Sequence, residues 1–386
     1  MATRFDTMPK AGLFREEHQE LRAAVRKFVE GQIRPRVEQW EAAGDFPYRE
    51  VFRAAGSLGL FGAKYEEEFG GTGPDLVADA VITEELARCG SGGVAAALGA
   101  HKDLGPYYLY LCGDQEQRRR WLVPAVAGEA IGALAVTEPA AGSDVAGIQA
   151  RADREHGGWR LSGAKTFITN GPIADFVVVA AKTEPDRGRE GISLFVVEAG
   201  ATGFTAHRVE TTGWRTSHTG ELVFDAAPAE LLGQEGAGFA YLMEGFSWER
   251  VVMALAAVAG AQATLELATA YGRERRAFGR PVATFQVWRH RFADLATEIE
   301  AARSLTYHAL RKIVGGEDAT AEVSMAKWYS SELAWKVADE ALQIHGGYGY
   351  MMEFPVQRAW RDSRLGPIGG GTTEVMKEII GRSFGL

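Results

Sequence analysis

The first third of the chain carries apolar residues at helical spacing. Steps of four and three residues separate most members of one apolar stripe, which is the repeat of an amphipathic helix; the stripe consists of Leu21, Val25, Phe28, Val29 and Ile33. Glycine and proline interrupt the pattern at 44–47 and at 70–74, where helices are expected to end. The pattern predicts an N-terminal helical domain over residues 1–129.

The pattern changes to short β-type runs between residues 130 and 233. These runs are rich in valine, isoleucine and phenylalanine, are separated by glycine, asparagine or aspartate, and cover 158–168, 176–181, 192–197 and 222–224. Short runs with turn residues between them favour antiparallel pairing. We expect a middle antiparallel β domain over residues 130–233, built as a barrel or a sandwich.

Helical spacing returns after Gly233 and continues to the end of the chain. One long seam repeats at steps of three and four residues, as in a bundle helix; it is formed by Phe285, Trp288, Phe292, Leu295, Ile299 and Ala302. Further helices are expected over 238–273, 319–345 and 372–382. The chain is therefore assigned to the α+β class, with a C-terminal four-helix bundle over residues 234–386.

Composition narrows the class of protein. Of the 386 residues, 46% are hydrophobic and 24% are charged, which fits globular domains and argues against a disordered chain or a coiled-coil rod. Acidic residues outnumber basic residues by 51 to 42, so the formal net charge is −9. This acidic balance, without a basic cluster, argues against a nucleic-acid partner.

Signals for metal binding and targeting are also weak. Cys89 and Cys112 form no CxxC pair, so neither a disulfide framework nor a cysteine zinc site is expected, and no metal is assigned. Residues 1–20 lack the apolar core of a signal peptide. No continuous apolar run reaches the ~18 residues of a membrane span. These features favour a cytoplasmic protein.

Glycine is unusually frequent, with 47 residues, and three loops that contain glycine are candidates for ligand contacts. The first, TEPAAGSD at 137–144, follows an apolar strand and suits either a phosphate-binding turn or an ordinary strand connection. The second, QIHGGYGY at 343–350, ends a helix, which argues against a Rossmann loop and leaves a helix C-cap or a cofactor contact. The third, GGGTTE at 369–374, opens the last helix with Thr372 or Thr373 as N-cap, and suits a ligand contact or a hinge.

Glu249 is the acidic residue that stands out. Phe246, Arg250 and Met253 place it on or beside the apolar stripe of its helix. A carboxylate among apolar neighbours has a raised pKa, which suits a general base for a weakly acidic carbon. A structural ion pair with Arg250 or Arg273 is the alternative interpretation.

Five motifs together resemble the acyl-CoA dehydrogenase family in their order and spacing. They are TEPAAGSD, KTFITNG at 165–171, RERRAFGRP at 273–281, QIHGGYGY, and IGGGTTE at 368–374. The resemblance covers nearly the whole chain. It implies a helical domain, a β-barrel and a four-helix bundle, assembled as a homotetramer that binds one FAD per subunit.

The resemblance also implies which residues hold FAD. Thr137 and Thr169 would hydrogen-bond the flavin ring, and Phe167 would lie against it. Ser143 would contact the pyrophosphate and is also assigned to the substrate side. Positions that reach the FAD of a neighbouring subunit in the family are matched by Arg275, Phe278, Gln286, Gln343, Gly346 and Gly347.

The reaction implied is α,β-dehydrogenation of an acyl thioester to the trans-2-enoyl thioester. A carboxylate removes the α proton as hydride leaves the β carbon for the flavin, and fixed donors polarise the thioester oxygen. In the family these donors are a flavin ribityl hydroxyl and a backbone N–H, which Gly370 matches. Thr372 and Glu374 match positions near the adenosine part of FAD, although Glu374 stands where many members have Gln.

The commonest base position of the family is not acidic in this chain. Many members carry the base in a Tyr-Glu-Gly-Thr stretch, whereas this chain has glycines at 369–371. Isovaleryl-type and long-chain-type members place the base on a bundle helix before an arginine, as in Trp248-Glu249-Arg250. The resemblance therefore assigns Glu249 as the base and Arg250 to positioning acyl-CoA or the loop over it, with both base positions expected to face the same α carbon.

The same resemblance suggests partners. The substrate is an acyl-CoA or an acyl-carrier-protein thioester of open chain length and branching, and the electron acceptor is an electron-transfer flavoprotein. Flavin monooxygenases and a nucleic-acid-associated flavoprotein share the fold without this reaction. The carboxylate at 249 and the acidic net charge argue against both alternatives.

Overall fold

The N-terminal third of the chain folds into helices, as the apolar spacing predicts. The computed structural model describes residues 12–155 and 157–385, so the expectations for residues 1–11 lie outside the described residues. Short 3₁₀ and π turns connect several of the helices. The helices are α1 (Glu16–Phe28), α2 (Val37–Ala43), α3 (Tyr48–Ser57), α4 (Leu76–Leu86), α5 (Gly92–Asp103), α6 (Gly105–Cys112), α7 (Gln115–Gln117) and α8 (Val123–Val126).

Local caps set the ends of these helices. The Asp75 carboxylate accepts two backbone N–H groups at the start of α4, and the Ser91 hydroxyl accepts one at the start of α5. Gly44 has φ +65°, the left-handed conformation that ends α2. The chain between residues 70 and 75 is not helical. Both interruptions expected from glycine and proline are confirmed.

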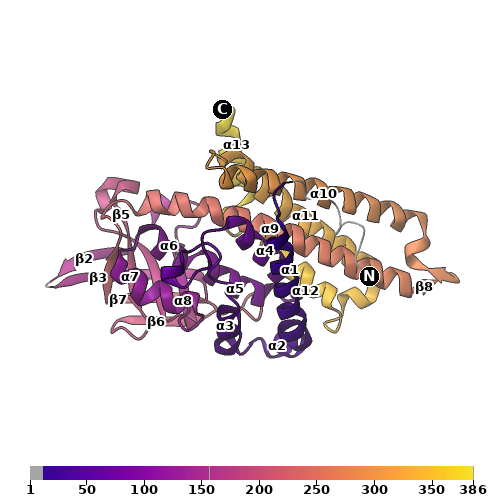
Figure 1. The fold of residues 1–386 in the computed structure, drawn as a ribbon, viewed down its shortest axis with the longest axis horizontal. Helices are drawn as coiled ribbons and strands as arrows, with labels where there is room; N and C mark the ends of the chain where they lie inside the picture. Colours follow the sequence, from indigo (N-terminus) through magenta and orange to yellow (C-terminus); the bar gives the residue numbers. More distant parts are fainter. Residues whose placement is uncertain (1–11, 156, 386) are drawn as a thin grey trace.

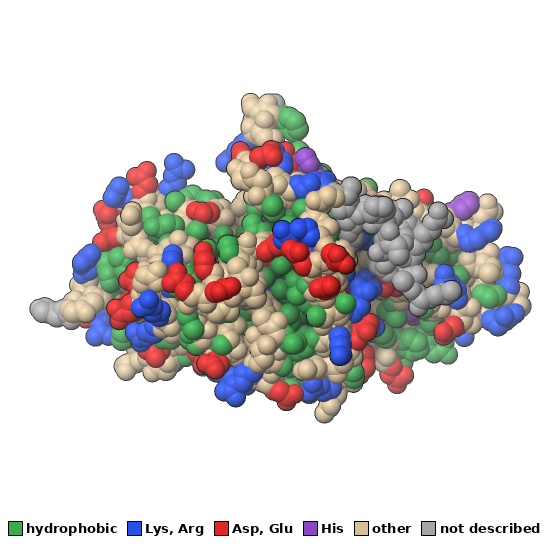
Figure 2. Space-filling view, viewed as in Figure 1, with side chains coloured by type: hydrophobic (Ala, Val, Ile, Leu, Met, Phe, Trp, Pro, Cys, Tyr) green, Lys and Arg blue, Asp and Glu red, His purple; other side chains and the backbone are tan. Residues whose placement is uncertain are grey.

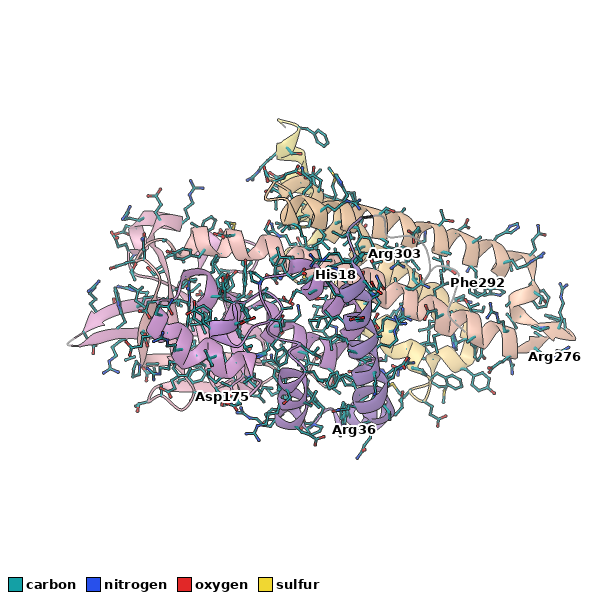
Figure 3. All side chains as sticks on the ribbon, viewed as in Figure 1. His18, Arg36, Asp175, Arg276, Phe292 and Arg303 are labelled. Carbon is teal, nitrogen blue, oxygen red and sulfur yellow. The ribbon has the colours of Figure 1, made fainter. Side chains whose placement is uncertain are left out.

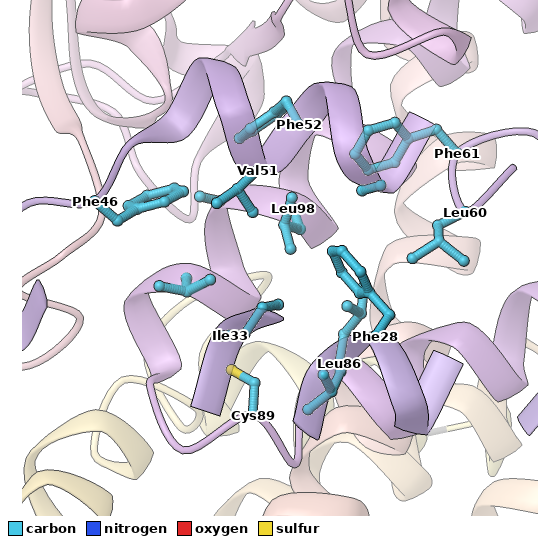
Figure 4. Close-up of a cluster of buried hydrophobic side chains, with 14 of the residues drawn as sticks. Phe28, Ile33, Phe46, Val51, Phe52, Leu60, Phe61, Leu86, Cys89 and Leu98 are labelled. Atoms are coloured by element: carbon cyan, nitrogen blue, oxygen red, sulfur yellow. The ribbon is translucent and has the colours of Figure 1, made fainter. Parts of the chain in front are cut away.

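One hydrophobic cluster fills the space between these helices (Figure 4). The Phe52 and Phe61 rings lie 5.8 Å apart, and the His101 ring packs against both. Burial of each large apolar side chain contributes about 1.5–3 kcal/mol, so this cluster stabilises the N-terminal part strongly. Its buried members include Phe28, Ile33, Phe46, Val51, Leu60, Leu86 and Leu98.

A buried network of charges lies at the inner edge of the same part. Lys102 Nζ donates to Asp79 Oδ2 at 2.5 Å and to Asp103 at 2.9 Å, and Lys64 Nζ binds both carboxylates. All four side chains are almost completely buried. Two ammonium groups and two carboxylates balance one another, which keeps the cost of burying each charge low. The network links α4, α5 and the loop that carries Lys64.

The middle of the chain forms a β-barrel. Within the described residues, β4, β2, β3, β7 and β5 pair in that order, and β5 pairs back with β4, so the sheet closes on itself. Closure excludes the sandwich that the pattern left open. The strands are β1 (Gly132–Ala135), β2 (Arg151–Glu155), β3 (Gly158–Thr169), β4 (Phe176–Lys182), β5 (Ile192–Glu198), β6 (Phe204–Arg208) and β7 (Thr219–Leu232).

The expected antiparallel pairing needs one correction. β1 runs parallel to β4, with Gly132 opposite Phe176, and β2 meets β4 in a parallel pairing at Arg151 and Lys182. The remaining pairings within the barrel are antiparallel. The chain between β1 and β4 includes β2 and β3, so the connection is long enough to bring β4 back in the direction of β1.

The C-terminal part returns to helices. The seam that starts at Phe285 and the expected helices at 238–273 and 319–345 become three long helices. The fourth expected helix is only eleven residues long, and a nine-residue helix, α12, was not expected. The domain boundaries at 129 and 233 stay a prediction. The elements are α9 (Gly238–Glu274), β8 (Arg276–Ala277), β9 (Arg280–Pro281), α10 (Gln286–Val314), α11 (Thr320–His345), α12 (Pro355–Ser363) and α13 (Thr373–Ser383).

Helix α9 runs along the length of the molecule (Figure 1). Its first turns pack against the barrel, where Leu242 shares a hydrophobic cluster with Val136 and Ala141. Its last turn leads into the β8–β9 hairpin at the opposite end, and Figure 3 shows Arg276 at that tip, far from Asp175 on the barrel side. At 1.5 Å per residue, its 37 residues span about 55 Å.

The composition of α9 bears on the membrane span that the sequence argued against. Of the described helices, α9 is the one whose length and apolar content would allow it to cross a membrane, although no continuous apolar run indicated this. Within its most apolar window, 61% is buried inside the protein, as in a core helix. On the outer face seen in Figure 2, acidic and basic side chains are intermixed.

Lys102→Met should lower the free energy of unfolding by about 3–5 kcal/mol, because Asp79 and Asp103 would keep one buried cation instead of two. Urea unfolding followed by circular dichroism measures this loss. Lys27→Met on α1, where the side chain is exposed, is the matched control and should change stability by less than about 0.5 kcal/mol. Small and equal effects of the two variants would show that the network does not stabilise the fold.

Candidate active site

The carboxylate of Glu249 lies against the glycine loop at 369–371. Glu249 sits on α9, and Gly370 precedes α13, about 120 residues later in the chain. A Cβ atom built on Gly370 would lie 3.3 Å from Glu249 Oε1 and 2.2 Å from Met253 Sδ. The two family base positions therefore meet at one place. The same geometry shows that a side chain at position 370 would require the Met253 side chain to move.

Burial makes the Glu249 carboxyl a weaker acid than an ordinary glutamate. Desolvation raises its pKa to about 7, and the negative charge of Asp103 adds to the rise. The positive charges of Arg250 and Lys327 oppose this rise without cancelling it. The residue as a whole is only partly buried. A carboxyl with this pKa can accept a proton near neutral pH.

The alternative interpretation of Glu249 as half of a structural ion pair does not fit the structure. Arg273 lies 24 residues further along α9, which at 1.5 Å per residue is about 36 Å away. Arg250 adjoins Glu249, but its Nε is buried without a hydrogen-bond partner among the described residues. That Nε lies 3.8 Å from a Cβ built on Gly371. Arg250 thus faces the glycine loop, as expected for a residue that positions the loop or its ligand.

The glycine loop has the backbone shape that only glycine adopts easily. Gly370 has φ +60° and Gly371 has φ +95°. In the described part of the chain, no carbonyl or side chain accepts a hydrogen bond from the Gly370 N–H. Thr372 caps α13, since its hydroxyl accepts from the Val375 N–H at 3.3 Å, and this decides between the two candidate N-caps. Glu374 is exposed in the first turn of α13.

The predicted flavin contacts on the barrel come together at the ends of two strands. The Thr166 N–H donates to the Thr137 carbonyl at 2.9 Å, which joins the turn after β1 to β3. Next to this link, Phe167 is 69% exposed and has φ +60°. Thr169 ends β3 and Ser143 is exposed in the 137–144 turn. An exposed phenylalanine in left-handed backbone is strained, and such strain is concentrated at ligand sites.

Sequence reasoning missed the pair that holds this turn. The buried Glu138 carboxylate accepts from the Gln149 N–H at 2.6 Å, from the Ala150 N–H at 2.9 Å and from Lys165 Nζ at 2.8 Å. Lys165 Nζ also donates to the Val136 carbonyl at 2.8 Å. Glu138 and Lys165 both lie in the recognised motifs. The signal that could have found them is a single acid and a single lysine, each among small and apolar residues.

The other predicted cofactor residues lie at the far end of α9. The Arg275 guanidinium lies 5.5 Å from the Tyr348 ring, so the β8–β9 hairpin meets the 343–350 loop. Exposed positions nearby are Gln343 in the last turn of α11, Gly346 and Gly347 directly after that helix, and Gln286 at the start of α10. Phe278 is 95% exposed. Arg275 comes 33 residues after Leu242, about 50 Å along the helix, so one chain does not bring this group to the barrel group.

Other chemically capable residues have structural surroundings. Cys89 and Cys112 are free, and burial raises their pKa values to about 11 and about 12, which suits unreactive thiols. The buried His345 ring stacks on Tyr271 at 4.0 Å, as expected for a packed histidine. Ligand atoms of Glu17, His18 and Asp75 lie within 4.8 Å of one another, but an Arg15 nitrogen already binds Asp75 at 2.7 Å.

Models of three acyl-CoA dehydrogenase domains match the chain in order. The N-terminal domain model matches residues 15–129, the middle domain model 133–227, and the C-terminal domain model 236–385. The chain belongs to the acyl-CoA dehydrogenase family. The matches confirm the family that the five motifs indicated. They also make the protein an enzyme of the oxidoreductase class, in a family that depends on flavin.

Individual relatives support the same membership. The long-chain specific acyl-CoA dehydrogenase of Mus musculus is 40% identical over 96% of this chain and 87% of its own length. The isovaleryl-CoA dehydrogenase of Solanum tuberosum is 38% identical over 96% of this chain and 91% of its own. The crystal structure of an acyl-CoA dehydrogenase from Geobacillus kaustophilus has a TM-score of 0.92 and 42% identity, with 97% and 99% covered. The acyl-CoA dehydrogenase fold is therefore confirmed.

Glu249→Gln should stabilise the acyl-CoA dehydrogenase more at high pH than at low pH. The folded pKa of Glu249, about 7, lies above the ordinary value of 4.5, so the folded state holds the proton more tightly and loses stability as pH rises through that interval. We expect the variant to gain about 1–2 kcal/mol over wild type between about pH 5 and pH 8; the partial opening to solvent keeps this below the full linkage value. Unfolding curves at both pH values measure the gain, and a pH-independent difference would contradict the raised pKa.

Proposed function

We propose that this enzyme uses FAD to dehydrogenate an acyl thioester between its α and β carbons, with Glu249 as the base. The observation that carries the proposal is the position of Glu249 beside Gly370: Glu249 Oε1, on a carboxyl of raised pKa, lies 3.3 Å from the place that a Cβ on Gly370 would occupy, and the Gly370 N–H has no acceptor among the described residues. A weakly acidic α carbon needs both a base and a donor for the thioester oxygen. The two stand side by side.

Each residue of this pair has a defined task. Glu249 takes the α proton, and its pKa near 7 lets it hold that proton until it is released. The Gly370 N–H donates to the thioester oxygen, where negative charge develops as the proton leaves. Arg250 borders the glycine loop and holds it or the substrate. When bound, FAD supplies the acceptor for the hydride that leaves the β carbon.

The barrel residues suit the flavin half of the cofactor. Phe167 offers an exposed aromatic face, Thr137 and Thr169 offer hydroxyls, and the open turn with Ser143 and Gly142 has room for close approach of an anion. Thr372 and Glu374 are assigned to the adenosine side, and Ser143 also to the substrate.

The hairpin and loop residues at the far end of α9 are assigned to the FAD of a second copy of the chain. Arg275 supplies the charge there, with Phe278, Gln286, Gln343, Gly346 and Gly347 around it. The separation of about 50 Å along α9 supports a shared site, because a single FAD does not reach both groups in one chain. A homotetramer is the assembly that we propose, and the cytoplasm is the proposed compartment.

The proposal also covers the type of acyl substrate, its carrier and the electron acceptor. The proposed base lies on α9, and position 370 is a glycine without a side chain. This combination favours the isovaleryl-type or long-chain-type reaction geometry. Coenzyme A is the proposed carrier, with acyl carrier protein as the alternative, and an electron-transfer flavoprotein is the proposed electron acceptor. The buried base argues against the monooxygenase and nucleic-acid-associated alternatives, for which no described residue gives support.

Glu249→Gln should keep FAD and ligand binding and slow bleaching of the flavin by a saturated acyl-CoA. The amide preserves shape and loses basicity, and a general base is worth about 10²–10⁴-fold, with the weak acidity of the α carbon placing this case at the upper end. Anaerobic stopped-flow absorbance measures the rate. Glu244→Gln, at an exposed position of the same helix, should bleach normally. Wild-type bleaching by Glu249→Gln would remove Glu249 as the base.

Arg275→Ala should weaken FAD binding while the chain stays folded. Loss of one charged hydrogen bond to phosphate costs about 1.5–3 kcal/mol, which is roughly 10- to 150-fold in Kd. Titration of the apoprotein with FAD measures the change. Arg273→Ala, an exposed arginine in the last turn of α9, is the control. Equal FAD affinity of both variants would contradict the role of Arg275 in a shared site.

A further inference from the structure

A buried lysine forms hydrogen bonds to the segment that contains the glycine loop. Lys327 lies on α11 and is completely buried. Its Nζ donates to the Gly366 carbonyl at 2.8 Å and also to the Gly371 carbonyl. These two carbonyls stand on either side of the segment that contains Gly370. One ammonium group therefore ties both ends of this short segment to the same point of α11.

The same ammonium acts on the base. Four helices supply charged and titratable groups that interact with Glu249: Arg250 from α9 itself, Asp103 from α5, Tyr108 from α6 and Lys327 from α11. Lys327 and Arg250 favour the ionised carboxylate, and Asp103 opposes it. Burial lowers the pKa of Lys327 to about 8, and Glu249 in turn favours its charged form. Below that pH, Lys327 carries its charge.

We propose that Lys327 is a positioning residue that sets the Gly370 N–H against Glu249 and keeps the Glu249 carboxylate ionised. The inference rests on the proposed function, because it needs Glu249 as the base. A lysine suits both tasks: its three N–H donors serve two carbonyls, and its compact charge remains close to the carboxylate. A neutral donor would hold the loop without favouring the ionised base.

Two measurements on the holoenzyme separate this role from a merely structural one. Lys327→Met removes the donors and the charge. We expect the maximal bleaching rate by acyl-CoA to fall about 100-fold, as for a misplaced reacting group, while KM changes little. The acid limb of kcat/KM should move to higher pH, because a positive charge beside Glu249 is lost.

The loop supplies a readout that does not depend on activity. Hydrogen exchange of residues 366–376, followed by mass spectrometry, should speed up in Lys327→Met because both carbonyl contacts are gone. Lys336→Met on the same helix is the matched control: that side chain is half-exposed and pairs with Glu298. It should leave the bleaching rate, the pH profile and the exchange of the loop as in wild type.

The outcomes distinguish this inference from the proposed function. A wild-type acid limb or wild-type exchange of 366–376 in folded Lys327→Met would overturn the role of Lys327, whereas wild-type bleaching by Glu249→Gln would overturn the base itself. If Lys327→Met does not fold, Lys327→Gln makes the same pH comparison, because it keeps an amide donor and carries no charge. An unshifted acid limb in that variant would also overturn the proposal.

Discussion

The close approach of the Glu249 carboxylate to the Gly370 backbone is the constraint on which the rest of the structure depends. Two adjacent glycines with left-handed backbone form this place, and a Cβ on Gly370 would force the Met253 side chain, whose sulfur would lie 2.2 Å from it, to move. The close approach also requires a carboxyl removed from most of the surrounding water, and this burial raises its pKa to about 7. The glycine at 370 and the acid at 249 therefore depend on each other. A side chain at 370 would fill the space beside Glu249, and without the acid at 249 this place would hold no carboxyl.

Helix α9 carries this constraint into all parts of the fold. The Trp248 indole N–H, one residue before the base, donates to Asp103 at 3.0 Å, which anchors α9 to the buried charge network of the N-terminal helices. The first turns of α9 pack on the barrel, and Lys327 reaches the glycine loop from α11. The neighbourhood of Glu249 is thus held by contacts from helices that lie far apart in the sequence, so the position of this carboxyl depends on the packing of the whole chain.

The spacing of apolar residues was enough to predict the long helices and to single out Glu249 as an unusual acid. The helix expected at 238–273 ends one residue later than predicted, and Glu249 lies beside its apolar stripe as expected. Helix α12 has nine residues, too few for a clear stripe, and the direction of β1 depends on the path of the chain through β2 and β3. Lys327 lies 39 residues from Gly366, and Glu138 lies 27 residues from Lys165, so no local pattern reveals either pairing.

The far end of α9 links cofactor binding to assembly if the site is shared as proposed. Phe278 is 95% exposed in left-handed backbone, a conformation that costs on the order of 1 kcal/mol, whereas covering such a ring yields about 1.5–3 kcal/mol. A second copy of the chain that covers the hairpin would recover this free energy and bring Arg275 to the cofactor. FAD would then bind more tightly to the assembly than to the single chain, and by linkage FAD would strengthen the assembly by the same factor. The length of α9 would thus separate the proposed base, Glu249, from the surface that we assign to the cofactor of a neighbouring copy.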